Sequence, residues 1–444
     1  MTNRLDLGKE EIFPLILKMS WPSIIAMTAM SLYNFIDTFW LARLSSQALA
    51  ALTVCFPIQL IASAVGVGTG IGAGSFAARM FGAGKNLQAK QTAGQILSLS
   101  LFFGLVMIIS VLLFGDSIIL LFGASNEIMP LCHDYLYIIV FCAPFGLFTL
   151  MTNNLLRAEG RPLISMYIFL ITFISNAILD PFLIFGIGPF PRLGIKGAAT
   201  AAFIANLLSF IFSLLFLKLK SSKYEFKLKY TIPDIRIIKL IYSTGLPSIV
   251  INLVGGLVLV IYNHVLADFG FKSIAAFGIC FRIMSMATMV VFGIGAGLMP
   301  IVGFSEGAKL YQRLKESVFA ALKVSLLFAA AAFMFLEIFA SPIVGLFSKD
   351  TSLLVIATQA LRIHASALIL IAPIIIFMYT LMGLGKGTLA MFLLFFRDSV
   401  VFIPLLIILP SFWGITGVWM ALPLTNLIAL FVVIFWTRKE LHGK

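Results

Sequence analysis

Two aspartates and one asparagine lie in long apolar stretches of the chain, where ionisable groups are rare. Asp37 lies in the first such stretch, and Asp180 follows Asn176 by four residues in the fifth. That spacing places Asn176 and Asp180 on one face of a helix. An ionised carboxylate near the centre of a bilayer costs at least ~2.5–3.5 kcal/mol, so it is usually kept for an ion, a proton or a partner.

These three side chains suit two related chemistries. Two carboxylates in one dry cavity repel each other, which favours holding a proton between them. Carboxylate, amide and hydroxyl oxygens can instead surround a dehydrated Na⁺. Asp37, Asn176 and Asp180 are therefore the predicted site for a coupling cation, H⁺ or Na⁺. The structural alternatives are that Asp180, which precedes Pro181, caps a broken helix, or that Asp37 pairs with a distant arginine.

The composition places these residues in a membrane protein. Of 444 residues, 61% are hydrophobic and 11% are charged, against roughly 45–50% and about 25% in soluble domains. A bilayer crossing needs about 20 apolar residues in a helix. Twelve runs qualify, at 14–41, 48–78, 92–114, 128–155, 163–186, 195–217, 238–267, 273–304, 318–347, 352–380, 388–410 and 414–436. The predicted fold is an all-α integral membrane protein with twelve transmembrane helices.

The net charge of +13 would suggest nucleic acid as a partner in a soluble protein. Here the two termini and the loops after even-numbered runs, counted with the adjoining ends of the runs, hold 22 Lys and Arg; the loops after odd-numbered runs, counted in the same way, hold five. Basic residues concentrate in cytoplasmic loops. The distribution predicts two cytoplasmic termini, with membrane lipid rather than nucleic acid around the chain.

The two halves of the sequence repeat each other. A shift of 225 takes Pro22-Ser23-Ile24 to Pro247-Ser248-Ile249 and Cys55-Phe56 to Cys280-Phe281. Each half has six runs, so we expect parallel repeats in an N-terminal lobe (1–217) and a C-terminal lobe (238–444), joined by a basic cytoplasmic linker (218–237). Transporters use two such bundles to expose a site alternately to each side of the membrane.

The predicted cation site belongs to one repeat only. The same shift takes Asp37, Asn176 and Asp180 to Tyr262, Val401 and Leu405. A purely architectural role would not require this asymmetry.

Several segments resemble the multidrug and toxic compound extrusion (MATE) family, and its bacterial and archaeal DinF-like branch. They are Asp37-Thr38-Phe39, Ala48-Leu49-Ala50-Ala51, the glycine-rich run 66–84, Leu156-Arg157-Ala158-Glu159-Gly160-Arg161, Asn176-Ala177-Ile178-Leu179-Asp180-Pro181, Gly194-Ile195-Lys196-Gly197-Ala198-Ala199 and Leu246-Pro247-Ser248. The resemblance implies a V-shaped, two-lobed exporter that works as a monomer in the cytoplasmic membrane of a bacterium or archaeon. It further implies that amphipathic, often cationic, compounds leave in exchange for H⁺ or Na⁺.

The resemblance also assigns roles to individual residues. It points to Asp37, Asn176 and Asp180 for cation coupling and to Pro22 as the place where the first helix bends. It implies a hydroxyl from the sixth helix, for which Thr200 is the nearest candidate. Thr200 lies two residues from the family position, which is about 200° around a helix.

A cavity that accepts many compounds needs adaptable apolar walls, which Met and aromatic side chains provide. The predicted lining residues are Tyr33, Asn154, Tyr262, Met284, Met286 and Met289. In the second half, we expect Arg397-Asp398 to pair with Arg282 or Glu337, as structural ions or as a secondary cation site.

The sequence has no Walker motif, nucleophile triad or metal-ligand cluster, and its glycine run lacks the GKS or GKT ending of a phosphate loop. The prediction is a secondary transporter with no enzymatic step and no cofactor. The main alternative is a flippase for a lipid-linked oligosaccharide from the same superfamily, which would need cationic residues to hold a diphosphate. A major-facilitator transporter is disfavoured because residues 79–90 lack its acidic GxxxD pattern.

Overall fold

The computed structural model describes residues 4–218, 222–224, 227–347 and 350–442, and none of them lies in a strand. In this part of the chain, 12 helical segments are long and apolar enough to cross a membrane. The predicted all-α fold with twelve transmembrane helices is therefore confirmed.

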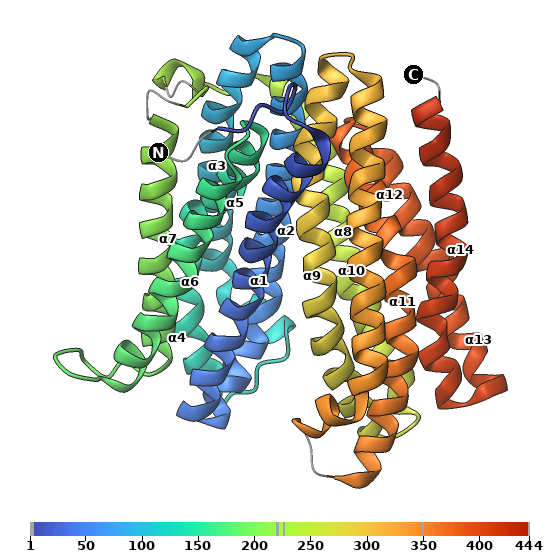
Figure 1. Ribbon diagram of the computed structural model, residues 1–444. Coiled ribbons are helices and arrows are strands. Elements are labelled where there is room, and N and C mark those ends of the chain that lie inside the picture. The colour runs from blue at the N-terminus through green and yellow to red at the C-terminus, as the bar shows by residue number, and fades with distance from the viewer. Residues whose placement is uncertain (1–3, 219–221, 225–226, 348–349, 443–444) are drawn as a thin grey trace. The chain divides into compact units, whose positions relative to one another are not determined.

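Fourteen α-helices follow one another along the described chain (Figure 1). Two spans are built from two helices each: α4 and α5 are joined by a 3₁₀ turn at Val140–Cys142, and α12 and α13 by a π-helical turn at Phe396–Phe402. The bounds are α1 Ile12–Leu44, α2 Ser46–Gly82, α3 Asn86–Leu121, α4 Met129–Ile139, α5 Ala143–Ala158, α6 Pro162–Phe185, α7 Ile195–Lys218, α8 Ile235–Ala267, α9 Phe271–Gly307, α10 Tyr311–Gly345, α11 Thr351–Gly383, α12 Gly387–Phe395, α13 Ile403–Trp413 and α14 Ile415–His442.

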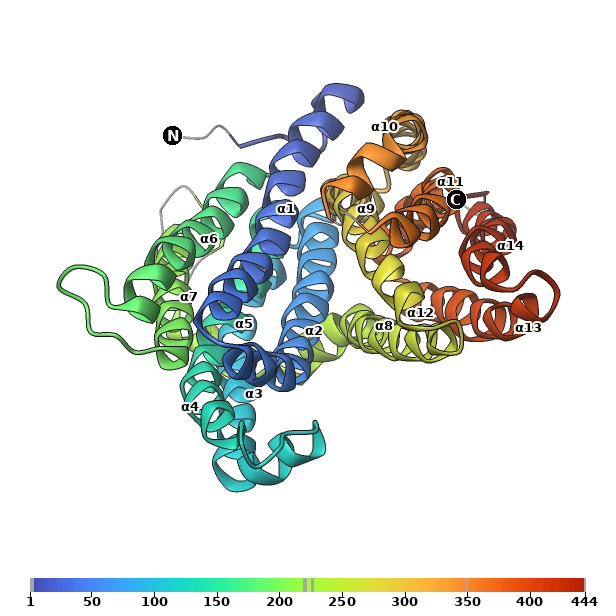
Figure 2. The same cartoon turned by 90° about the horizontal axis from the view of Figure 1, so that it is seen from below.

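The chain forms two compact units, and each is a helical bundle when viewed along its helices (Figure 2). Unit 1 comprises Met1–Leu5 and Ile25–Ile249, and unit 2 comprises Asp6–Ile24 and Val250–Lys444. Helix α1 therefore begins in unit 2 and continues in unit 1 from Ile25 onward. Helix α8 begins in unit 1 and continues in unit 2 after Ile249. Ile249 is the residue of the second repeat that is equivalent to Ile24.

The repeat recurs in local backbone geometry. Non-helical backbone angles interrupt α3 at Phe114 and α10 at Phe339, which are 225 positions apart. Gly84 (φ 71°) and Lys309 (φ 59°) share a left-handed backbone after α2 and α9 at the same offset. Because the kinks and helix ends coincide, the duplication extends to the backbone path.

Buried thiols pack in the same way in both repeats. The Cys55 thiol faces the carbonyl oxygen of Cys132 at 3.9 Å, and the Cys280 thiol faces that of Ala357 at 3.4 Å. The four residues correspond at an offset of 225, so the repeat also preserves side-chain packing.

Close helix packing explains part of the glycine run. A Cβ at Gly72 would lie 2.2 Å from the Ile241 carbonyl oxygen, so α2 and the first half of α8 touch through this glycine. In unit 2, a Cβ at Gly297 would lie 2.8 Å from the Met19 carbonyl carbon. In each unit, a glycine-lined helix face thus packs closely against the first half of another helix, and the second half of that helix belongs to the other unit.

The predicted linker is bound to unit 1 where the structure describes it; residues 219–221 and 225–226 lie outside the described part. Gln95 of α3 donates from Nε2 to the carbonyl oxygens of Tyr230 and Ile232, each at 2.8 Å, and its Oε1 accepts from the Asp234 N–H at 2.9 Å. The second part of the linker is therefore held on α3.

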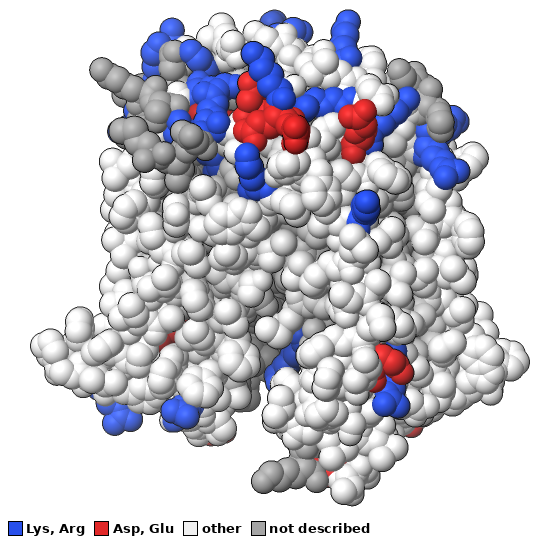
Figure 3. Space-filling model, viewed as in Figure 1, with Lys and Arg blue, Asp and Glu red and all other residues white. Residues whose placement is uncertain are grey.

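Charged side chains gather toward the ends of the helices, and the middle of the surface in view is almost free of them (Figure 3). This apolar band is what a lipid-facing surface requires. The cytoplasmic location of the termini stays a prediction.

Candidate functional site

Asn176 and Asp180 lie one helical turn apart on α6 and are both fully buried. Asn176 Nδ2 donates to Asp180 Oδ1 at 3.1 Å. Helix α6 continues through Pro181 to Phe185, so Asp180 is inside a helix and does not cap a broken one. The hydrogen bond keeps the carboxylate and the amide oxygen on the same side of α6.

Asp37 of α1 lies beside this pair and is 5% exposed. Its carboxyl group interacts with both Asp180 and Asn176. Among the described residues, Asp37 forms no ion pair with an arginine. The structure thus brings together the three residues predicted for cation coupling.

The cluster has unused acceptor atoms. Within the described part of the chain, Asp37 Oδ1, Asp180 Oδ2 and Asn176 Oδ1 are buried and have no hydrogen-bond partner. A buried oxygen without a partner loses its hydration energy, so a group of three such atoms is costly unless a cation or protons fill the gap. Carboxylate and amide oxygens suit Na⁺, and the carboxylates alone suit H⁺.

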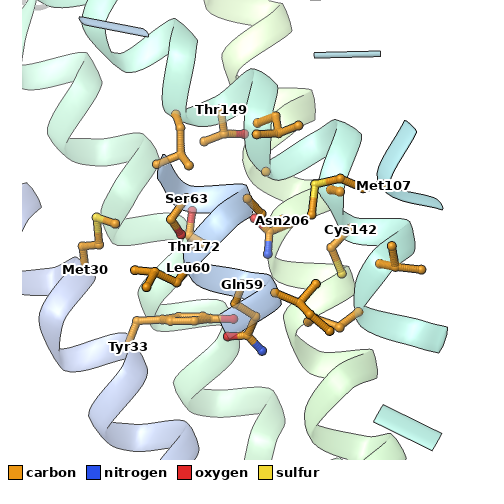
Figure 4. A pocket seen from close by; sticks show the side chains of 18 of the residues that line it. Met30, Tyr33, Gln59, Leu60, Ser63, Met107, Cys142, Thr149, Thr172 and Asn206 are labelled. Carbon is orange, nitrogen blue, oxygen red and sulfur yellow. The ribbon is translucent and has the colours of Figure 1, made fainter. Parts of the chain in front are cut away.

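A cavity of about 300 Å³ lies inside unit 1. Its walls come from helices α1 to α7 and the turn between α4 and α5, and most of its lining is apolar (Figure 4). Tyr33, Gln59, Thr172 and Asn206 contribute polar groups, and none of the described lining residues is charged. This volume and composition are typical of a small-molecule pocket.

The cavity and the acidic cluster share two helices. Tyr33, on the cavity wall, precedes Asp37 by four residues on α1, and Thr172 precedes Asn176 by four on α6. Four residues make about one turn and about 6 Å along the axis. A cation bound at the cluster would therefore lie about one turn from a compound in the cavity.

The other residues predicted in the first half have different surroundings. Asn154 is 5% exposed, donates to the Leu150 carbonyl oxygen at 3.2 Å and accepts from Arg157 at 3.0 Å, and it is not among the cavity-lining residues. The Thr200 hydroxyl donates to the Lys196 carbonyl oxygen at 2.7 Å. Among the described residues, Thr200 forms no hydrogen bond with the acidic cluster.

Tyr262, the residue of the second repeat that is equivalent to Asp37, is part of an aromatic cluster. The Tyr262 ring stacks on Phe277 and Phe402 at centroid distances of 4.2 and 5.7 Å. The Tyr262 hydroxyl lies 3.3 Å from His364 Nε2. Unit 2 therefore has a packed core where unit 1 has buried carboxylates.

The three predicted methionines all belong to α9. Met284 and Met289 are partly buried, and Met286 is 57% exposed. Pro22 lies inside α1, which continues through it. The second-half charges pair differently from the expectation: Arg397 pairs with Asp398 itself at 2.9 Å, and Glu337 pairs with Arg362 at 3.6 Å.

Sequence reasoning missed most of the cavity's polar residues. Gln59 donates to the Tyr135 hydroxyl at 2.6 Å, and the Thr172 hydroxyl contacts that of Ser209. The available signal was a polar residue inside an apolar run, which Gln59 and Asn206 both give. Their convergence from different helices required the fold.

A third buried carboxylate, Glu159, lies outside the spans, directly after α5. Glu159 is 2% exposed. It accepts from the Lys223 backbone N–H at 2.6 Å and from the Ser222 hydroxyl at 3.1 Å. Burial raises the pKa of Glu159 to about 7, although Arg161, Ser222 and Arg4 each act to lower it. This carboxylate holds the first part of the linker on unit 1.

Twelve spanning helices in two parallel repeats, with a buried cluster of acids in one of them, define the class of membrane transporters built by duplication. A family model described as MatE matches residues 22–182 and 247–408, one segment in each repeat. The chain belongs to this family of transporters and is a multi-pass membrane protein.

Individual relatives cover nearly the whole chain. It is 31% identical to a protein named FAD transporter from Shewanella oneidensis, over 96% of this chain and 95% of that one. It is 27% identical to the multidrug export protein MepA of Staphylococcus haemolyticus, over 96% and 93%. Among solved structures, an outward-facing multidrug resistance MATE family transporter of the MOP superfamily matches with a TM-score of 0.94 and 26% identity, over 100% of this chain and 99% of that one.

Proposed function

We propose that this protein exports small amphipathic, often cationic, organic compounds in exchange for H⁺ or Na⁺ by alternating access. The observation that best supports this proposal is the group of buried oxygens without hydrogen-bond partners on Asp37, Asn176 and Asp180 among the described residues. This group lies about one helical turn from an uncharged cavity. The likeness to multidrug export protein MepA supports small organic compounds as substrates.

The exchange follows from electrostatics. The carboxylates attract a cationic compound to the cavity, and a proton or Na⁺ that neutralises them removes this attraction. Binding of the coupling ion therefore disfavours the compound and promotes its release. Bending of α1 at Pro22 accompanies the switch, and the protein acts as a monomer with both termini in the cytoplasm.

The coupling ion is identified by efflux from proteoliposomes. A fluorescent cation is loaded, and a pH gradient and a Na⁺ gradient are imposed separately. Each tenfold gradient supplies about 1.4 kcal/mol per ion exchanged, apart from any membrane potential. Efflux faster than in protein-free liposomes is expected with one of the two gradients. Equal leakage with and without protein under both gradients would refute coupled export.

A second candidate substrate is a flavin nucleotide. The observations that favour it are the 31% identity to a protein named FAD transporter and a cavity whose hydroxyl and amide groups can bond the edge of a flat heteroaromatic ring. Efflux of flavin mononucleotide compared with a cationic dye, in the same liposomes, distinguishes the two substrates.

A further inference from the structure

Arg397 and Asp398 are two adjacent charged residues deep in a span of unit 2. Helix α12 begins at Gly387, so Arg397 is about 15 Å along the axis from that end of the span. Their side chains are 14% and 17% exposed, and Arg397 Nη1 donates to Asp398 Oδ1 at 2.9 Å. A buried ion pair is often no more stable than apolar residues of similar size. Its presence at this depth therefore suggests a function.

The local backbone turns these groups toward the inside of the bundle. Arg397 and Asp398 lie in the π-helical turn Phe396–Phe402. Such turns close hydrogen bonds over five residues and are frequent at functional sites. Phe402, five residues after Arg397, is 4% exposed and stacks on the buried Tyr262 ring. Arg397 therefore shares the inward side of this turn.

The repeat locates the equivalent place in unit 1. Arg397 corresponds to Thr172 at offset 225, and Asn426 corresponds to Asn206 at offset 220. Thr172 and Asn206 both line the cavity of unit 1. In unit 2, Arg397 Nε donates to Asn426 Oδ1 at 2.9 Å. A guanidinium group thus stands where the first repeat has a neutral cavity wall.

The hydrogen-bonding atoms that Arg397 and Asn426 leave unused are mainly donors. Arginine has no acceptor, so the Asn426 atom that faces it must be the oxygen, which leaves Nδ2. Asn426 is fully buried, and its Nδ2 has no partner among the described residues. The bonds of Arg397 in the same part of the chain use Nε and Nη1, which leaves Nη2. Two nearby N–H donors, one of them charged, fit a carboxylate or a phosphate.

We propose that Arg397 and Asn426 form an anion subsite in unit 2, which binds a carboxylate or phosphate group of an exported compound. This inference rests on the proposed export function and favours its second candidate substrate class, compounds that carry an anionic group on a flat heteroaromatic body. Asp398 holds the guanidinium group in place when the subsite is empty.

The test is equilibrium binding to the detergent-purified full chain, followed by quenching of flavin fluorescence. Three probes share one ring: riboflavin is neutral, carboxymethylflavin carries a carboxylate and flavin mononucleotide carries a phosphate. We expect at least one anionic probe to bind about tenfold more tightly than riboflavin, as one charge-assisted hydrogen bond provides. Arg397→Gln should abolish that preference and leave riboflavin binding unchanged.

Matched variants keep the test decisive. Arg362→Gln removes an exposed arginine from the same unit and should leave all three affinities unchanged. If Arg397→Gln fails to fold with Asp398 unpaired, the double variant Arg397→Gln/Asp398→Asn removes both charges and should show the same selective loss. Binding of both anionic probes no tighter than riboflavin, or an equal loss for all three probes, would overturn the subsite. Selective binding without efflux in liposomes would instead refute the proposed export and leave the subsite intact.

Discussion

Replacing Glu159 by Gln should make the protein's stability less dependent on pH. Burial raises the pKa of this carboxyl from 4.5 to about 7. Below pH 4.5 the group is protonated in both the folded and the unfolded chain. As the pH rises through 4.5 to 7, the unfolded chain loses the proton more readily, so the folded state loses stability.

The magnitude follows from the two pKa values. Their separation corresponds to about 3 kcal/mol lost between pH 4 and pH 8. A change of 1 kcal/mol shifts the melting temperature of a 150–250-residue unit by about 2–4 °C, so the wild-type melting temperature should fall by roughly 6–12 °C relative to Glu159→Gln.

The assay is thermal unfolding of the detergent-purified protein, followed by tryptophan fluorescence at pH values from 4 to 8. The control is Glu316→Gln, which removes a carboxylate from an exposed helix surface where it accepts a hydrogen bond from Gln312. This control should melt like the wild type at every pH. Parallel curves for the wild type and Glu159→Gln would refute the argument from burial.

Two further pairs of substitutions test the packing and the backbone. Gly72→Val should greatly reduce the yield of monodisperse protein in size-exclusion chromatography, because its Cβ would lie 2.2 Å from the Ile241 carbonyl oxygen. Gly255→Ala should not reduce the yield, because a Cβ at Gly255 would have nothing within 4 Å. Equal yields for the two variants would contradict the packing. Lys309→Gly should raise the melting temperature, because a left-handed backbone costs a non-glycine residue about 1–2 kcal/mol. For the same reason, Gly84→Ala should lower the melting temperature. Shifts in the opposite directions would contradict the shared backbone geometry.

The sequence predicts the architecture of this protein well, because the bilayer imposes strong constraints. Each span must satisfy its own backbone hydrogen bonds, so apolar runs translate directly into helices. The offset of 225 also predicts local features that composition alone does not, such as the kinks at Phe114 and Phe339. The acidic cluster is predictable for a related reason: a buried charge is rare enough to be noticed.

The cavity and the linker are harder to predict. Gln59, Thr172 and Asn206 come from three helices, and their meeting depends on how those helices rotate against one another. Hydrophobic periodicity says little about rotation in a chain that is apolar all round. The linker appears in the sequence as a basic loop, yet Gln95 and Glu159 hold its described parts on unit 1 through contacts with its backbone and a serine hydroxyl. Every residue type has backbone donors or acceptors, so contacts made to the backbone cannot be predicted from the residue types of the linker.

The central claim is that Asp37 and Asp180 couple export to a cation. The measurement is transport in proteoliposomes under two regimes: concentration driven by a cation gradient, and exchange of labelled for unlabelled compound without a gradient. The wild type should perform both, and Asp37→Asn and Asp180→Asn should each keep exchange but lose gradient-driven concentration. Concentration at wild-type rates in either variant would contradict the account.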